Sequence, residues 1–268
     1  MSDTEPLLSV RDLRVVFPGT AEGNAAVAGI DFDLFPGQTL GLVGESGSGK
    51  STVCLAILGL LPRGTRVTGQ ILFRGRDLVT LGDRAMRPIR GREIGLVYQD
   101  PLGALNPTRT IGSQLRESLR LHLGLSGAAA DDRAVDLLER VGIQSARAKL
   151  TAYPHEFSGG MRQRVVIAMA ISCNPVLLLA DEPTTALDVS VQAQVLELLQ
   201  DLSAELGLAL MLVSHDLSVV AGLSDVTAVM RYGEIVEQGE VDDVFSRPQH
   251  PYTRALLDTV RALEREDA

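Results

Sequence analysis

One stretch constrains this chain more than any other. The sequence "GLVGESGSGKST", residues 41–52, places four glycines around Lys50 and follows it with two hydroxyl side chains. The apolar run "QTLGLVG" before it predicts a buried strand, and "KSTVCLAILGLL" after it predicts an apolar helix that we expect to end at Pro62. Glycines let backbone amides converge on an anion, and the start of a helix adds about half a positive charge. The stretch therefore predicts a phosphate-binding loop.

Residues 44–51 fit the pattern G-x-x-x-x-G-K-[ST], which cradles the phosphates of a nucleotide. We expect Lys50 to reach the terminal phosphates and Ser51 to offer its hydroxyl to Mg²⁺. The alternative is a glycine-rich turn without a ligand, but the strand before it and the helix after it favour a phosphate-binding loop. The residues expected to hold the nucleotide are Gly44, Glu45, Ser46, Gly47, Ser48, Gly49, Lys50, Ser51 and Thr52.

A pair of acids follows a second predicted buried strand, in "VLLLADEP". Asp181 and Glu182 stand at the carboxyl end of this strand, where ligand crevices form in parallel sheets. We expect Asp181 to hold Mg²⁺, directly or through water, and Glu182 to act as a general base, which commonly contributes ~10²–10⁴-fold in rate. The alternative is an exposed acid pair that caps the next helix.

Two further polar residues follow strand-like runs. His215 comes after "LALMLVS" and is expected at the same sheet edge, where it would contact the γ-phosphate or orient the attacking water. Gln99 follows "IGLVY", and its amide could sense the metal or the water. Taken singly, His215 would be structural and Gln99 a surface residue; their positions favour the functional interpretation.

Composition and charge narrow the possible classes of protein. The chain has 268 residues, 45% of them hydrophobic, which suffices for a substantial core, and its net charge of −9 argues against a dedicated nucleic-acid binder. We expect the arginine-rich run "RAMRPIRGRE", residues 84–93, to be a solvated face. The acidic start lacks a secretory signal, and no apolar run reaches the ~20 residues of a membrane helix. Cys54 and Cys173 are expected to be buried thiols in a reducing cytosol.

At "EFSGGMRQR", residues 156–164, the chain departs from ordinary kinases and GTPases with a phosphate loop. Together with the other motifs, this segment resembles the nucleotide-binding subunit of an ATP-binding cassette (ABC) transporter. The resemblance implies that Phe17 stacks on adenine, that Gln99 is the Q-loop residue, and that His215 is the switch histidine. It also implies a second Walker motif at Asp181 and Glu182, a D-loop at 186–188 that ends in Asp188, and a signature formed by Ser158, Gly159, Gly160 and Met161.

The signature departs from the usual L-S-G-G-Q, with Phe157 first and Met161 last, but its small and polar centre is intact. Ser158 before two glycines predicts a helix start that can donate to an anion, although Ser158 could simply cap its own helix. In the family, the signature engages the γ-phosphate held by a second cassette. The resemblance therefore implies that two cassettes close head-to-tail over two ATP molecules.

The resemblance implies one ABC ATPase domain over residues 1–268, with the α/β fold of a P-loop NTPase. We expect a RecA-like core with a mainly parallel sheet and an N-terminal antiparallel β subdomain in 1–91 and 173–240. A helical signature subdomain, in which "SGAAADD" is an ordinary loop, is expected over 92–172, and a helical tail over 241–268. The metal-facing groups would be Ser51, Gln99 and Asp181.

Four stretches are similar to dipeptide, oligopeptide and nickel importer ATPases: "YQDPLGALNP", "YPHEFSGGMRQRV", "ADEPTTALDV" and "RPQHPYTRALL". The likeness implies an ATPase at the cytoplasmic face of the cell membrane, working with two permease subunits, an extracytoplasmic binding protein and a second, related ATPase, without nucleic acid. The expected cargo is a di- or oligopeptide, with nickel or a metal chelate as the alternative. Two further hypotheses are a soluble ABC ATPase that acts on nucleic acid or ribosomes, and a small-molecule kinase. The kinase hypothesis leaves "FSGGM" unexplained.

Overall fold

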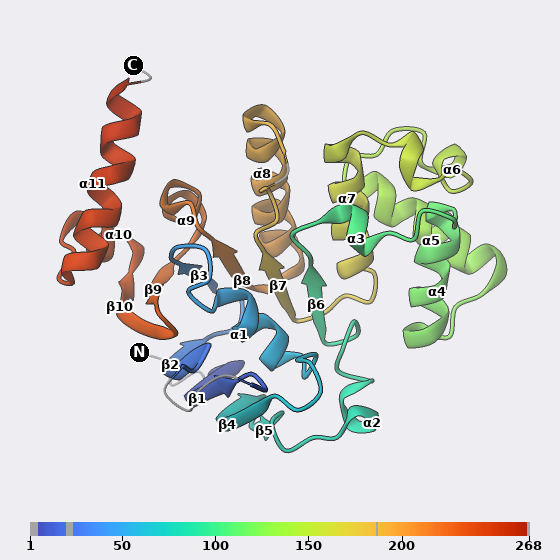
Figure 1. The fold of residues 1–268 in the computed structure, drawn as a ribbon. Coiled ribbons are helices and arrows are strands. Elements are labelled where there is room, and N and C mark those ends of the chain that lie inside the picture. The colour runs from blue at the N-terminus through green and yellow to red at the C-terminus, as the bar shows by residue number, and fades with distance from the viewer. Residues whose placement is uncertain (1–4, 20–23, 186, 267–268) are drawn as a thin grey trace. The chain divides into compact units, whose positions relative to one another are not determined.

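The computed structural model describes residues 5–19, 24–185 and 187–266, without the side chains of 260–266. The chain divides into two compact units, which are described separately (Figure 1). Unit 1 comprises residues 1–86 and 209–268, and unit 2 comprises residues 87–208.

Unit 1 contains an antiparallel sheet in the strand order β2-β1-β4-β5. These strands lie side by side at the blue and teal end of the chain in Figure 1. Alternating buried and exposed positions in the first of them, as in Leu13 and Val15, give the sheet one buried face. The bounds are β1 Leu8–Val16, β2 Val27–Leu34, β4 Arg66–Phe73 and β5 Arg76–Asp77.

The same unit holds a second set of strands that carries the phosphate loop. β3 (Thr39–Val43) pairs in parallel with β8 (Ala209–Ser214) and with β9 (Val226–Arg231), and β10 (Glu234–Glu240) pairs antiparallel with β9. Every residue of β3 and β8 is buried, as expected for parallel strands covered on both faces. The helices of unit 1 are α1 Lys50–Ile57, α2 Asp83–Met86, α9 Leu217–Leu223, α10 Val241–Ser246 and α11 Pro251–Glu266.

Unit 2 is mainly helical. Its two strands, β6 (Ile94–Val97) and β7 (Leu177–Asp181), pair in parallel. Ile111, Leu115 and Leu119 recur every four residues along one helix and are fully buried, so this helix turns one apolar face inward. The helices are α3 Pro101–Ala104, α4 Ile111–Leu123, α5 Gly127–Arg140, α6 Ala146–Lys149, the 3₁₀ turn η1 Pro154–Glu156, α7 Gly159–Ala170 and α8 Val189–Leu206.

The structure corrects two expectations about local structure. "SGAAADD" is not a loop: α5 begins at Gly127, because its alanines favour a helix and Ala130 is buried against the unit. The helix after the phosphate loop ends at Ile57 and not near Pro62. Gly59 adopts a left-handed φ of 60°, and the Leu60 amide donates to the Leu55 carbonyl, which closes the helix in a glycine C-cap.

Candidate nucleotide site

The phosphate loop leaves β3 and enters α1 with a backbone that requires glycine. Gly44 has φ 155° and Gly49 has φ 107°, a region that side chains avoid. A Cβ atom on Gly44 would lie 2.1 Å from the Met230 carbonyl oxygen, and one on Gly49 would lie 2.3 Å from the Ala26 carbonyl oxygen. The glycines thus let the loop pass directly against neighbouring backbone.

Lys50 lies at the centre of the loop and is only 3% exposed. Its Nζ donates to the carbonyl oxygens of Gly44 at 2.8 Å and Glu45 at 2.9 Å, and it lies 3.5 Å from Ser48 Oγ. A buried ammonium needs such partners because desolvation disfavours the charge. Ser51 and Thr52 follow in the first turn of α1, both half-buried. The loop therefore fixes one positive charge at the start of a helix.

The expected neighbour of the loop, His215, emerges at the same sheet edge. β3 and β8 are parallel, and Val43 lies opposite Ser214 in their register. Gly44 follows Val43 at the end of β3, and His215 follows Ser214 at the end of β8. The His215 side chain is exposed. Phe17 directly follows β1 and is half-buried.

In unit 2, Gln99 and Glu182 likewise follow neighbouring parallel strands. Val97 lies opposite Ala180 in the β6–β7 register, so both residues leave the sheet at one edge. Gln99 Nε2 donates to Glu182 Oε2 at 3.1 Å, and Thr185 Oγ1 donates to the same oxygen at 2.9 Å. We call the group Gln99, Asp181, Glu182 and Thr185 the acidic edge. Two donors thus hold the carboxylate in one orientation.

The backbone at Glu182 is strained. Its φ is 46°, in the left-handed region that a residue with a side chain rarely adopts, at a cost of about 1–3 kcal/mol. Such outliers persist where the surrounding structure fixes them, and here buried Pro183 follows directly. The turn aims the Glu182 carboxylate toward the side chains of Gln99 and Thr185.

The groups expected to hold Mg²⁺ have suitable chemistry. Because the amide nitrogen of Gln99 is used on Glu182, its carbonyl oxygen is left as the donor for a metal. Half-buried Asp181 of unit 2 has a carboxylate at the last position of β7, and Ser51 of unit 1 has a hydroxyl in the first turn of α1. Oxygen ligands of this kind fit Mg²⁺, which binds through one or two carboxylates and substrate phosphates.

The predicted signature lies at the start of α7. Ser158 is the N-cap and its Oγ accepts a hydrogen bond from the Met161 amide at 3.3 Å, so it does cap its own helix while remaining exposed. A Cβ on Gly160 would lie 2.4 Å from Val191 Cγ1 of α8, whereas one on Gly159 would lie at an ordinary 3.6 Å from Leu187. Gly160 is therefore required where α7 packs against α8.

Asp188 of the predicted D-loop is the N-cap of α8. Its carboxylate accepts hydrogen bonds from Ser190 Oγ at 2.8 Å and from the Val191 amide at 3.0 Å. The hydrogen bond from Ser190 and that from the Val191 amide lower the pKa of Asp188 below its ordinary value. Ala186 of the predicted D-loop lies outside the described residues.

Sequence reasoning missed two residues beside the phosphate loop. Tyr252, in the stretch "HPYT", accepts a hydrogen bond from the Glu45 amide at 3.3 Å. Arg231, at the end of β9, packs against the Tyr252 ring with 4.5 Å between its Cζ and the ring centroid. The only signal in the sequence was the resemblance of "RPQHPYTRALL" to importer ATPases, which did not indicate contact with the loop.

The arginine-rich run is only partly a solvated face. Arg87 and Arg92 are exposed, but with half-buried Arg90 and His122 they line a pocket of about 570 Å³ in unit 2. Burial, and then the charge of Arg92, lower the pKa of His122 below its usual value. Cys54 and Cys173 are buried, as expected.

Comparisons with known protein families agree with this geometry. The family model described as "ABC transporter" matches residues 27–185, and that described as "Oligopeptide/dipeptide transporter, C-terminal region" matches residues 236–268. The chain belongs to the ABC transporter family of ATP-binding subunits.

Individual relatives are named as transport ATP-binding proteins. The chain is 51% identical to the oligopeptide transport ATP-binding protein OppD of Bacillus subtilis, over 96% of this chain and 73% of that protein. It is also 51% identical to the peptidoglycan transport ATP-binding protein YejF of Agrobacterium fabrum, over 96% of this chain but about half, 47%, of that protein. A solved post-hydrolysis dimer of the ATP-binding cassette MJ0796 with ADP and Pi has 26% identity and a TM-score of 0.76, over 87% of this chain and 98% of that one.

These comparisons confirm the predicted family, the P-loop NTPase fold class and the prediction of an ATP-binding transport ATPase. The described helices are each too short or too polar to cross a bilayer.

Proposed function

We propose that this chain hydrolyses MgATP to drive the import of di- or oligopeptides through separate permease subunits. The observation that carries the ATPase part is Glu182, which the side chains of Gln99 and Thr185 orient at the end of a buried strand. The names of relatives such as the oligopeptide transport protein of Bacillus subtilis support the peptide cargo. Nickel or a metal chelate is the alternative cargo.

The proposed roles follow from the chemistry of each group. The phosphate loop and Lys50 bind the triphosphate, and Phe17 stacks on adenine. Glu182 takes a proton from the attacking water, while His215 orients that water or contacts the γ-phosphate. Mg²⁺, held by Ser51, Asp181 and the Gln99 carbonyl, would neutralise charge that develops on the phosphates.

Exchange of Glu182 for glutamine tests the hydrolytic role. Glu182→Gln keeps the shape and the hydrogen bonds to Gln99 and Thr185 but cannot accept a proton. We expect ATP binding to be retained and turnover to fall by ~10²–10⁴-fold. Glu197→Gln, an exposed position on α8, is the matched control. Undiminished hydrolysis by Glu182→Gln would rule out Glu182 as the base.

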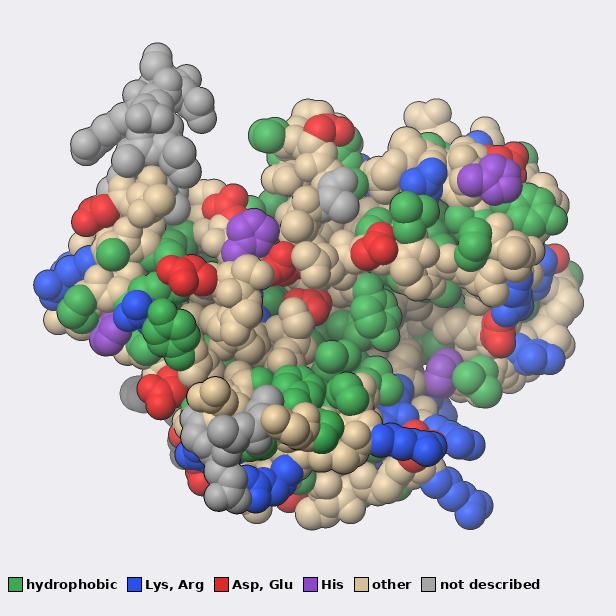
Figure 2. Space-filling view, viewed as in Figure 1, with side chains coloured by type: hydrophobic (Ala, Val, Ile, Leu, Met, Phe, Trp, Pro, Cys, Tyr) green, Lys and Arg blue, Asp and Glu red, His purple; other side chains and the backbone are tan. Residues whose placement is uncertain are grey.

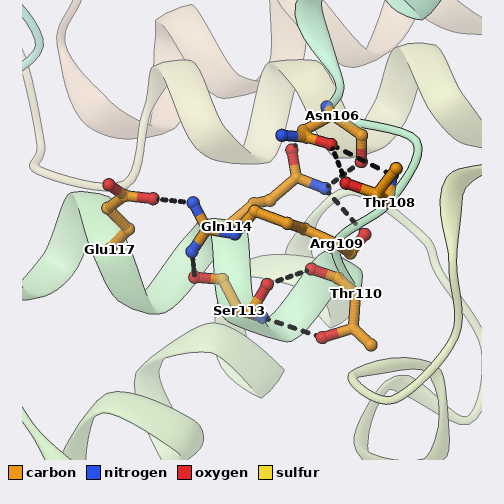
Figure 3. A network of polar contacts seen from close by, with 7 residues as sticks. All are labelled: Asn106, Thr108, Arg109, Thr110, Ser113, Gln114 and Glu117. Atoms are coloured by element: carbon orange, nitrogen blue, oxygen red, sulfur yellow. Dashed lines mark hydrogen bonds and ion pairs between the residues drawn. The ribbon is translucent and has the colours of Figure 1, made fainter.

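We propose that the permease docks on the Gln99 loop and on the helices that follow it, around "DPLGALNPTRT". Tyr98 and Leu102 are large apolar side chains with 44% and 58% exposure, and Figure 2 shows apolar side chains at the surface of unit 2 around α3 and α5. Hydrogen bonds cross the following loop (Figure 3): the buried Gln114 amide donates to the carbonyl oxygens of Asn106 and Arg109, both at 3.1 Å. Exposed apolar groups beside such a hydrogen-bonded loop suit a protein interface.

The remaining partners are a second ABC ATPase, whose ATP would meet the signature Ser158–Met161 of this chain, and an extracytoplasmic binding protein. This arrangement places the chain at the cytoplasmic face of the membrane. ATP must then bind the closed pair of cassettes more tightly than the open pair, because a ligand with equal affinity for both would not change the equilibrium between them.

Co-purification with two hydrophobic permease subunits, followed by reconstituted uptake, tests the whole assembly. Uptake and ATP turnover stimulated by peptides would support the proposal, whereas stimulation by nickel or a chelate would assign the alternative cargo. Nucleic-acid-stimulated turnover without membranes would contradict transport. In the same assay, Leu102→Glu should weaken coupling but not ATP binding by the isolated chain.

A further inference from the structure

The phosphate loop contains an acid in a site built for anions. Glu45 is the second residue of the loop and is exposed, and its charge opposes the binding of a triphosphate. A small pocket of about 50 Å³ lies beside the loop, lined by residues 45–48 together with Arg231, Tyr232 and Tyr252. Arg231, Tyr232 and Tyr252 therefore lie beside the phosphate loop within unit 1.

Arg231 contacts two aromatic rings. Its Cζ lies 4.9 Å from the centroid of the Tyr232 ring and 4.5 Å from that of the Tyr252 ring, both within the range of a cation–π contact. Its Nε is buried and has no hydrogen-bond partner among the described residues. The rings therefore fix a positive charge next to the phosphate loop.

Tyr252 joins this charge to the loop. Its side chain is largely buried, with the residue 7% exposed, and its hydroxyl accepts a hydrogen bond from the Glu45 amide. Burial raises the pKa of the Tyr252 hydroxyl above its ordinary value; the Glu45 carboxylate raises it too, while the Glu45 amide and Arg231 act in the opposite direction. The hydroxyl therefore ties the backbone of Glu45 in the phosphate loop to α11.

The segment that carries Tyr252 is itself anchored. The Glu237 carboxylate on β10 accepts hydrogen bonds from the Gln249 amide at 2.6 Å and the His250 amide at 3.0 Å. The Tyr252 amide donates to His250 Nδ1 at 3.2 Å. Tyr252, the second residue of α11, is therefore fixed from the side of the sheet as well as from the loop.

We propose that Tyr252 and Arg231 are positioning residues for ATP: Tyr252 holds Glu45 through its hydroxyl, and Arg231 offsets the negative charge of Glu45. This inference rests on the proposed binding of ATP by the phosphate loop. It gives the C-terminal region, which the oligopeptide transporter model matches over 236–268, a role in nucleotide affinity. Neither residue contacts the reacting atoms, so the expected effect is on binding and not on the chemical step.

A double-mutant cycle tests the proposal. Tyr252→Phe removes the hydroxyl and keeps the ring on Arg231. With Glu45 present, we expect the Kd and KM for ATP to rise about fivefold with kcat unchanged, which is the effect of about one hydrogen bond. A Glu45→Gln background keeps the backbone amide, so the loss caused by Tyr252→Phe should remain about fivefold there, whereas the loss caused by Arg231→Gln should fall from about fivefold to below twofold. Thr259→Val, which removes a hydroxyl bond to the Ala255 carbonyl within α11, is the control and should leave affinity unchanged.

Other outcomes separate the possible failures. No loss of affinity in Tyr252→Phe, or a loss in Arg231→Gln that is equal in both backgrounds, would overturn the positioning roles. If wild-type protein bound no ATP and Lys50→Ala made no difference, the proposed function itself would be overturned. Should Tyr252→Phe lower the melting temperature, the cycle of Arg231→Gln with Glu45→Gln decides alone, and a loss of affinity independent of Glu45 there would overturn the inference.

Discussion

The phosphate loop and the acidic edge use different means to place their functional groups. In the loop, glycines let backbone lie against backbone, with Cβ positions that would meet carbonyl oxygens at 2.1 and 2.3 Å. At the acidic edge, side chains hold a side chain, through two hydrogen bonds to Glu182. Adding a methyl group to a loop glycine should therefore weaken ATP binding. Removing a single hydrogen-bond donor at the acidic edge should lower the rate of hydrolysis.

The largest expected effect comes from Gly44→Ala. The new methyl would lie 2.1 Å from the Met230 carbonyl oxygen at a φ of 155°, and strain of about 1–3 kcal/mol or more should weaken ATP binding by ~100-fold. Gly47→Ala is the control, since its φ of 80° is also positive but nothing lies within 4 Å of its Cβ. Equal losses of ATP affinity in the two variants would show that the positive φ, and not contact with the neighbouring backbone, explains the need for glycine.

Gly160→Ala asks whether unit 2 also depends on the absence of a Cβ. The methyl would crowd Val191 at 2.4 Å, and we expect destabilisation of about 2 kcal/mol and a fall in Tm of ~4–8 °C. Gly159→Ala, with 3.6 Å of room, should change Tm little. Adding Val191→Ala should restore stability, and failure of this rescue in thermal unfolding would contradict the packing argument.

Thr185→Val removes one of the two donors to Glu182 with little change of shape. We expect turnover to fall about tenfold, as for the loss of a hydrogen bond to a charged group, while the Kd for ATP stays unchanged. Steady-state hydrolysis and ATP titration measure the two quantities. Thr259→Val, which removes a hydroxyl bond within α11, should alter neither. A lower ATP affinity in Thr185→Val would mean that the edge serves binding instead of hydrolysis.

The smallest effect concerns the anchor of the C-terminal region. Burial tends to raise the pKa of Glu237, but hydrogen bonds from the Gln249 and His250 amides leave it below the ordinary value. The carboxylate therefore stabilises the fold fully above the unfolded glutamate pKa of ~4.3, and this contribution is lost as the pH falls below it. Comparing Tm at pH 7 and pH 4, Glu237→Gln should reduce the acid-dependent fall by ~1 °C. An unchanged pH dependence would contradict this anchor.

The sequence predicted best what the backbone determines. The loop around Lys50 follows from glycines between an apolar strand and a helix, and the strand ends before Glu182 and His215 follow from apolar runs. The contacts of Glu182 with Gln99 and Thr185 could not be predicted, because parallel strands far apart in sequence must first be paired in register. For the same reason, nothing linked Tyr252 to Glu45, which is 207 residues earlier.

The pairing of β3 with β8 and β9 has a consequence for synthesis of the chain on the ribosome. β3 ends at Val43, but its parallel partners end at Ser214 and Arg231. At ~5–20 residues per second, the second partner is made roughly 10–40 s after the first strand. During this interval β3, buried at every position in the finished protein, is an unpaired apolar strand. Slow folding and a need for chaperones are expected to act at this stage.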